Sequence, residues 1–121
     1  MEIVHGNWNE MPWEHMRRNI SRVAWTGEGA TCLLGRAEPG HEKRPHGHAH
    51  EQIVIILEGE GWFHVGDDKY RVSAGSFLVI PPNVEHYLEV IGLKPVLDLD
   101  VFTPKRPEIL ESGYGAVEPK K

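Results

Sequence analysis

The chain has 121 residues, a length that a single domain of ordinary size fills. Its 40% hydrophobic and 26% charged residues are typical of a soluble globular protein, and its 13 glycines and 9 prolines suit short elements joined by turns. The formal net charge of -5 offers no basic surface to phosphate groups, which argues against nucleic acid as a partner.

Membrane and secretory classes are also disfavoured. The longest apolar run, residues 53–57, is far shorter than the roughly 20 residues of a membrane-spanning helix. The first residues lack the basic stretch and apolar run of a secretory signal, and the single cysteine, Cys32, cannot form a disulfide within the chain. We therefore expect a cytoplasmic protein with no membrane partner.

In chain order, the sequence predicts one domain with three parts. Residues 1–19 show neither a helical nor a strand period and suggest an N-terminal arm, which could cross to a partner subunit. Residues 20–103 contain β-rich segments separated by turn signals, and residues 104–121 form a C-terminal segment in which Pro107 could begin a short helix. The predicted strands cover residues 20–25, 31–37, 52–57, 61–65, 69–72, 76–80, 85–90 and 96–102.

Short strands at this spacing, without a long amphipathic helix between them, predict an all-β fold. An antiparallel sandwich or barrel is favoured, and a doubly wound α/β fold is disfavoured.

Histidines gather just before the segment that begins at Gln52 and again at His86. Alternate residues of an extended chain face the same side, so His46 and His48 can direct two imidazoles at one ion, and Gln52 has the same parity. His86 would then join from a strand that is adjacent in space. Three neutral imidazoles and an amide oxygen suit one divalent metal ion, which could be Zn, Ni, Fe, Mn or Co.

The other histidines are predicted to lie outside the ligand set. We expect His5, His15 and His41 to be in solvent. His50 has the parity of a ligand but is expected near the site or in solvent.

The spacing resembles the two motifs of the cupin family. The first motif is matched by Gly40, five residues, His46-Gly47-His48, three residues, Gln52, six residues and Gly59, with Gln52 where glutamate is usual. The second is matched by Gly75, five residues, Pro81, one residue, Asn83 in place of glycine, two residues and His86, with Val90 in place of asparagine. The resemblance implies a single antiparallel β-barrel or jelly roll with a metal on the three histidines and Gln52.

The last predicted strand carries an acidic face. Asp98, Asp100 and Phe102 share one side, and Leu97, Leu99 and Val101 share the other. Either solvent or the barrel interior could take the acidic side. In a pocket, Asp100 would be a candidate proton carrier.

Nearly the whole chain is similar to the KdgF proteins of pectin degradation, chiefly through residues 46–52, 80–86 and 100–106. That resemblance implies metal-assisted ring opening and ketonisation of 4,5-unsaturated galacturonate, a small acidic substrate of uronate catabolism. It places Asp100, Phe102 and Arg106 at the reacting site, with Asp100 moving a proton and Arg106 clamping the carboxylate. The residues alone would favour a solvated charge for Arg106.

Other functions fit the same motifs. They are an iron-dependent dioxygenase of a chelating substrate, a polyketide cyclase-like enzyme, and a non-enzymatic protein that binds a small molecule. A homodimer is expected by resemblance, because small cupins often pair through N-terminal strands.

Overall fold

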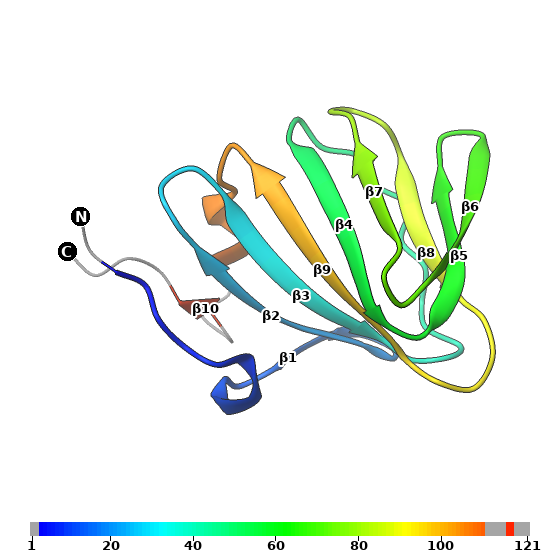
Figure 1. The fold of residues 1–121 in the computed structure, drawn as a ribbon, viewed down its shortest axis with the longest axis horizontal. Coiled ribbons are helices and arrows are strands. Elements are labelled where there is room, and N and C mark those ends of the chain that lie inside the picture. The colour runs from blue at the N-terminus through cyan, green and yellow to red at the C-terminus, as the bar shows by residue number, and fades with distance from the viewer. Residues whose placement is uncertain (1–2, 111–115, 118–121) are drawn as a thin grey trace.

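Two antiparallel sheets face each other in the computed structural model, which describes residues 3–110 and 116–117 (Figure 1). The larger sheet has the spatial order β1 (Glu14–Arg17), β2 (Ile20–Thr26), β3 (Thr31–Ala37), β9 (Val96–Thr103), β4 (Glu51–Glu58) and β7 (Phe77–Ile80). The smaller sheet has the order β6 (Asp68–Ser73), β5 (Glu60–Val65) and β8 (His86–Val90). This is the jelly-roll class that the sequence predicts, with all eight predicted strands present.

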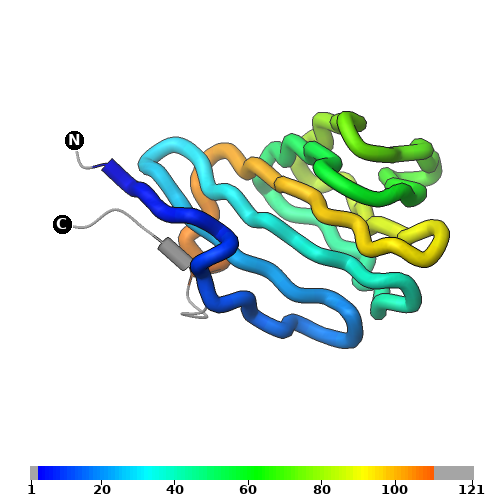
Figure 2. The backbone as a smooth tube through the Cα atoms, turned by 60° about the horizontal axis from the view of Figure 1, so that its bottom comes forward, coloured from blue at the N-terminus to red at the C-terminus, as the bar shows by residue number. Residues whose placement is uncertain are grey.

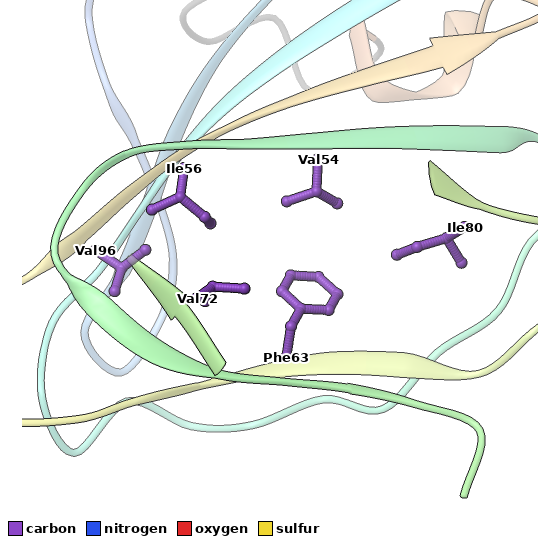
Figure 3. Packing of buried hydrophobic residues seen from close by; sticks show 6 residues of the cluster. All are labelled: Val54, Ile56, Phe63, Val72, Ile80 and Val96. Atoms are coloured by element: carbon purple, nitrogen blue, oxygen red, sulfur yellow. The ribbon is translucent and has the colours of Figure 1, made fainter. Parts of the chain in front are cut away.

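Buried residues alternate with less buried ones along the strands, so each sheet has one apolar face, and the two apolar faces pack together. Along β4, Gln52, Val54 and Ile56 are buried, whereas the intervening residues are only partly buried. Figure 3 shows Val54 and Ile56 pointing from β4 toward Phe63 of the opposite sheet. The buried cluster that joins the sheets consists of Val54, Ile56, Phe63, Val72, Ile80 and Val96.

Residues 1–19, predicted to form an N-terminal arm, contain a strand that the sequence did not indicate. Strand β1 pairs with β2 across a two-residue turn, in which Asn19 has φ 60, a conformation that asparagine tolerates. A register shift between His15 and Arg17 interrupts the alternation along β1, which explains why no strand period is visible in the sequence.

Residues 3–13 lie against their own sheet (Figure 2). The short 3-10 turn η1 (Trp8–Glu10) begins at Trp8, whose ring stacks on Trp25 of β2 with centroids 6.0 Å apart. The Trp13 ring receives the Arg36 guanidinium at 4.8 Å from its centroid. The arm is therefore held within the chain by aromatic contacts.

The C-terminal segment begins with the predicted turn at Pro107. It is a 3-10 helix, η2 (Pro107–Leu110), and its buried Ile109 packs with Phe102 and Ala24. A short strand, β10 (Ala116–Val117), pairs in parallel with β2, and the other residues after 110 lie outside the described part of the chain. Among the described residues, no helix is both long enough and apolar enough to cross a membrane.

The motif glycine Gly59 is required by the turn between β4 and β5. Its φ is 88, and a Cβ there would lie 2.4 Å from the Pro95 carbonyl oxygen and 2.8 Å from Val96 Cα. Asn83, which replaces a motif glycine, also has a positive φ of 65. Some motif positions are therefore set by backbone conformation, and others by metal binding.

We predict that Gly59→Ala lowers the free energy of unfolding by about 3 kcal/mol, because it combines left-handed backbone strain with a backbone clash. Denaturant unfolding measures the change. Gly29→Ala is the control, since a Cβ at Gly29 meets nothing within 4 Å. Equal stability of the two variants would contradict this account.

Candidate metal centre

The three predicted histidine ligands come from two segments that the backbone joins. His46 forms an isolated antiparallel bridge with His86, with N–O distances of 3.2 Å and 2.9 Å in the two directions. His48 follows two residues later, and its carbonyl oxygen accepts a hydrogen bond of 2.7 Å from the Asn83 amide. The loop before β4 is thus fixed to the start of β8, which brings the imidazoles together.

The ring orientations suit a metal ion. One ligand atom from each of His46, His48 and His86 lies within 4.8 Å of the others. Ligands at about 2.1 Å from one ion are roughly 3 to 4 Å apart, so the group needs to close by only about 1 Å. The histidine cluster is therefore nearly preformed.

Each ring is oriented through its Nδ1 atom. The Nδ1 atoms of His46, His48 and His86 lie 2.7 Å, 3.0 Å and 2.9 Å from the carbonyl oxygens of Arg44, His50 and Val84. A carbonyl oxygen only accepts, so Nδ1 of His46 and His86 carries the proton and donates a hydrogen bond, which leaves the Nε2 lone pair for a metal. In His48 both ring nitrogens face oxygens, and protonation at Nδ1 is the form that would direct its Nε2 lone pair to a metal.

His86 provides the strongest test of the fit. It is 2% exposed, and its buried Nε2 has no hydrogen-bond partner among the described residues. Burial is the main reason that its pKa falls to about 4, and burial also lowers the pKa of His48. Both rings are thus neutral near pH 7, which is the form that binds metal.

Gln52 completes the arrangement. Its Oε1 lies 2.9 Å from His48 Nε2, a separation of the size that neighbouring ligands of one ion show. Its side chain is also near enough to the Asp100 carboxyl to lower the pKa of that group. A glutamate at this position would place a further negative charge against Asp100, which gives a physical reason for the amide.

The acidic face of β9 lies in the interior. Asp98, Asp100 and Phe102 line the same cavity of about 220 Å³ as His46, His86 and Gln52. Burial raises the pKa of Asp100 to about 6, while side-chain hydrogen bonds with Asp98 and Gln52 and then the charge of Arg106 partly oppose that rise. Burial, followed by repulsion from Asp100, raises the pKa of Asp98. The two carboxyl groups can hold a proton beside the histidines.

Phe102 and Arg106 form one wall of the cavity. The Phe102 ring is edge-on to His48 at a centroid distance of 5.2 Å. The Arg106 guanidinium lies over the Phe102 ring, 4.5 Å from its centroid. Arg106 also donates from Nε to Glu108 at 2.8 Å and from its backbone amide to Thr31 at 2.8 Å. It lies at the cavity and is largely buried, unlike the solvated charge that the residues alone favour.

Two site features were missed by sequence reasoning. His41, expected in solvent, is 4% exposed and lines the cavity. Arg17 and Arg22 also line it, and for Arg17 the register shift in β1 left no sequence signal. His50 is outside the histidine group, although its carbonyl oxygen orients His48.

Residues 33–102, more than half of the chain, match the family described as the cupin domain. The chain is a cupin. Two curated relatives match parts of this cupin. Dimethylsulfoniopropionate lyase DddW of Ruegeria pomeroyi is 39% identical over 56 residues, covering 45% of this chain and 37% of the relative. An uncharacterised protein of Methanocaldococcus jannaschii is 39% identical over 46 residues, covering 38% of this chain and again 37% of the relative. The match thus spans little more than a third of either relative.

Solved structures share the cupin fold. An RmlC-like cupin from Shewanella frigidimarina superposes with a TM-score of 0.77 and 22% identity, covering 86% of this chain and 93% of that one. KdgF from a Halomonas species gives a TM-score of 0.76 with 23% identity, covering 84% of this chain and 95% of KdgF. A predicted oxalate decarboxylase from Thermotoga maritima gives a TM-score of 0.73 with 20% identity, covering 84% of this chain and 98% of that protein. These likenesses show the fold, and the cupins concerned include enzymes.

Proposed function

We propose that this cupin is a metal-dependent enzyme that acts on a small acidic substrate. The observation that carries the proposal is one small cavity lined by a raised-pKa carboxyl pair, an arginine, and His46 and His86 of the three-histidine cluster. His46, His48, His86 and Gln52 would hold one divalent ion. When bound, that ion would supply a Lewis acid for developing negative charge on oxygen.

The reaction we favour is ring opening and ketonisation of 4,5-unsaturated galacturonate. Opening breaks the bond between the anomeric carbon and the ring oxygen, and the resulting enol becomes a ketone when its carbon gains a proton. Asp100 would take the proton from oxygen and return it to carbon, so that the net change is an isomerisation. Arg106 would pair with the uronate carboxylate, since a guanidinium binds carboxylate through two hydrogen bonds.

Fold similarity with KdgF and the motif resemblance support this substrate. The direct test incubates the purified, zinc-loaded protein with 4,5-unsaturated galacturonate and follows the loss of ultraviolet absorbance of its conjugated double bond. Turnover supports the proposal, and metal binding without turnover rejects this substrate. Turnover with zinc in the absence of oxygen would also exclude an iron oxygenase.

A lyase acting on another small carboxylate is the second candidate. The identity of 39% with a dimethylsulfoniopropionate lyase over 56 residues favours it. Elimination needs a base that removes a proton next to a carboxylate, and Asp100 would be that base. Release of dimethyl sulfide from dimethylsulfoniopropionate, without turnover of the unsaturated uronate, would favour this candidate.

The proposed homodimer rests on the family resemblance. Because the N-terminal arm packs on its own sheet, a partner would contact the outside of the folded arm and sheet. We predict that multi-angle light scattering gives twice the mass of one chain at micromolar concentration. A mass of one chain at every concentration tested would reject the dimer.

A further inference from the structure

The cavity has a second group of positive charges on the hairpin formed by β1 and β2. Arg17 and Arg22 both line the cavity, which His46 and His86 of the histidine cluster also line. In the strand order of the large sheet, β3 and β9 separate this hairpin from β4, which carries Gln52. Three strand spacings of roughly 4.8 Å each place the hairpin about 14 Å from β4 along the curved sheet.

The register of the hairpin directs both arginines inward. Arg22 pairs with Gly35, which in turn pairs with Asp98 of the interior face. Strict alternation from Glu14, the partner of Arg22, would turn Arg17 outward, but the shift after His15 sets Arg17 opposite Ile20. Ile20 has the parity of Arg22, so the bulge returns Arg17 to the cavity side.

Both guanidinium groups are oriented by protein acceptors through one nitrogen only. Arg17 donates from Nε to the Glu42 carbonyl oxygen at 2.8 Å, and Arg22 donates from Nε to Glu14 Oε1 at 3.1 Å. Their terminal amino groups make no hydrogen bond to any described residue. A guanidinium held in this way presents a planar pair of donors, the arrangement that matches a carboxylate.

Three arginines gather at this end of the cavity. Arg17, Arg22 and Arg44 lie near the carboxylates of Glu14 and Glu42, and the remaining acid, Asp98 opposite Gly35, has a pKa that burial raises. Burial and then the charge of Arg44 lower the pKa of Arg17, with Glu42 opposing and Arg22 adding to the effect. The absence of a side chain at Gly35 lets the Asp98 carboxylate lie over it, because a Cβ there would approach Asp98 Oδ1 to 2.8 Å.

We propose that Arg17 and Arg22 form a carboxylate subsite at the end of the cavity away from the histidines. The ligand is then a small acid that places one oxygen-rich end at His46, His48 and His86 and a carboxylate at the hairpin. It is small because a cavity of about 220 Å³ lies below the roughly 300 Å³ at which ligand pockets commonly begin. The inference rests on the proposed function only in assigning the first end to the metal ligands.

The test compares matched probes by isothermal titration calorimetry on the zinc-loaded protein. Linear dicarboxylates of four to eight carbons are compared with their half-amides, which have the same shape and one charge fewer. We expect at least one dicarboxylate to bind about tenfold or more tightly than its half-amide, as loss of a charged hydrogen-bond pair predicts. The absence of such a preference at every length would overturn the proposal.

Variants then locate the preference. Arg17→Gln should remove most of it, Arg17→Lys should retain part of it, and Arg18→Gln should leave it unchanged. Arg18 is the matched control because it is exposed and donates to the Gly40 carbonyl oxygen. Melting temperatures show whether each variant is folded, and Arg22→Gln repeats the test if Arg17→Gln is not. A preference that survives in both folded glutamine variants would also overturn the proposal.

The outcomes separate this proposal from the proposed reaction. Uronate turnover without any dicarboxylate preference would reject the subsite and leave the reaction standing. A preference that depends on Arg17, without turnover, would keep the subsite and reject the substrate.

Discussion

His86→Ala is expected to abolish stable zinc binding. If the roughly 10 to 16 kcal/mol of a four-ligand zinc site is shared among its ligands, loss of one costs about 3 kcal/mol, or more than 100-fold in affinity. His86 should be the most sensitive ligand because its Nε2 is buried without another partner among the described residues. Elemental analysis after dialysis, and competition with a chromogenic chelator, measure the loss.

His64→Ala is the matched control for that experiment. His64 lies on β5 beside β8, but it pairs with Glu89 at 3.0 Å and stacks on Tyr87, away from the other three rings. If His86→Ala fails to fold, His46→Ala tests the same point, because His46 is exposed. Zinc retained at one ion per chain in both folded variants would refute the site.

Asp100→Asn is expected to lower kcat for the unsaturated uronate by about 10² to 10⁴, the usual contribution of a positioned acid or base. The asparagine keeps the size of the side chain but cannot carry the proton. Its zinc content should equal that of the unchanged protein, which separates proton transfer from metal loss. Asp67→Asn, at an exposed turn, is the control.

Arg106→Ala is expected to weaken binding of the unsaturated uronate. Loss of a charged pair with the carboxylate should raise KM by roughly 10-fold to 100-fold, and Arg106→Lys should restore part of it. Lys105→Ala is the neighbouring control, because Lys105 is exposed and faces Glu28. Unchanged turnover in both Asp100→Asn and Arg106→Ala would remove these residues from the mechanism.

The sequence predicted most of the fold because the barrel strands alternate regularly. Each interior residue of β4 is two positions from the next, and the same period placed Asp98, Asp100 and Phe102 on one face. Alternation shows which residues share a face of the sheet but not which face is buried, so it left open whether the acidic face met solvent or the interior. The packing of the second sheet against this face buries it.

The remaining errors have local causes. The bulge in β1 hid a strand, and with it the inward direction of Arg17. His41 lies in a loop between two strands, where burial depends on which chain segments close over it and no periodicity applies. Features that depend on a single irregular residue or on loop packing therefore left no pattern in the sequence.

The three histidines take their orientation from main-chain oxygens, not from side chains. Substitution at Arg44, His50 or Val84 leaves a carbonyl group in the same place, so the ring geometry does not depend on which residues occupy those positions. Such a centre can keep its metal while the side chains around it vary. Engineering of a new substrate range could therefore start at Arg44, which lines the cavity, without rebuilding the ligand set.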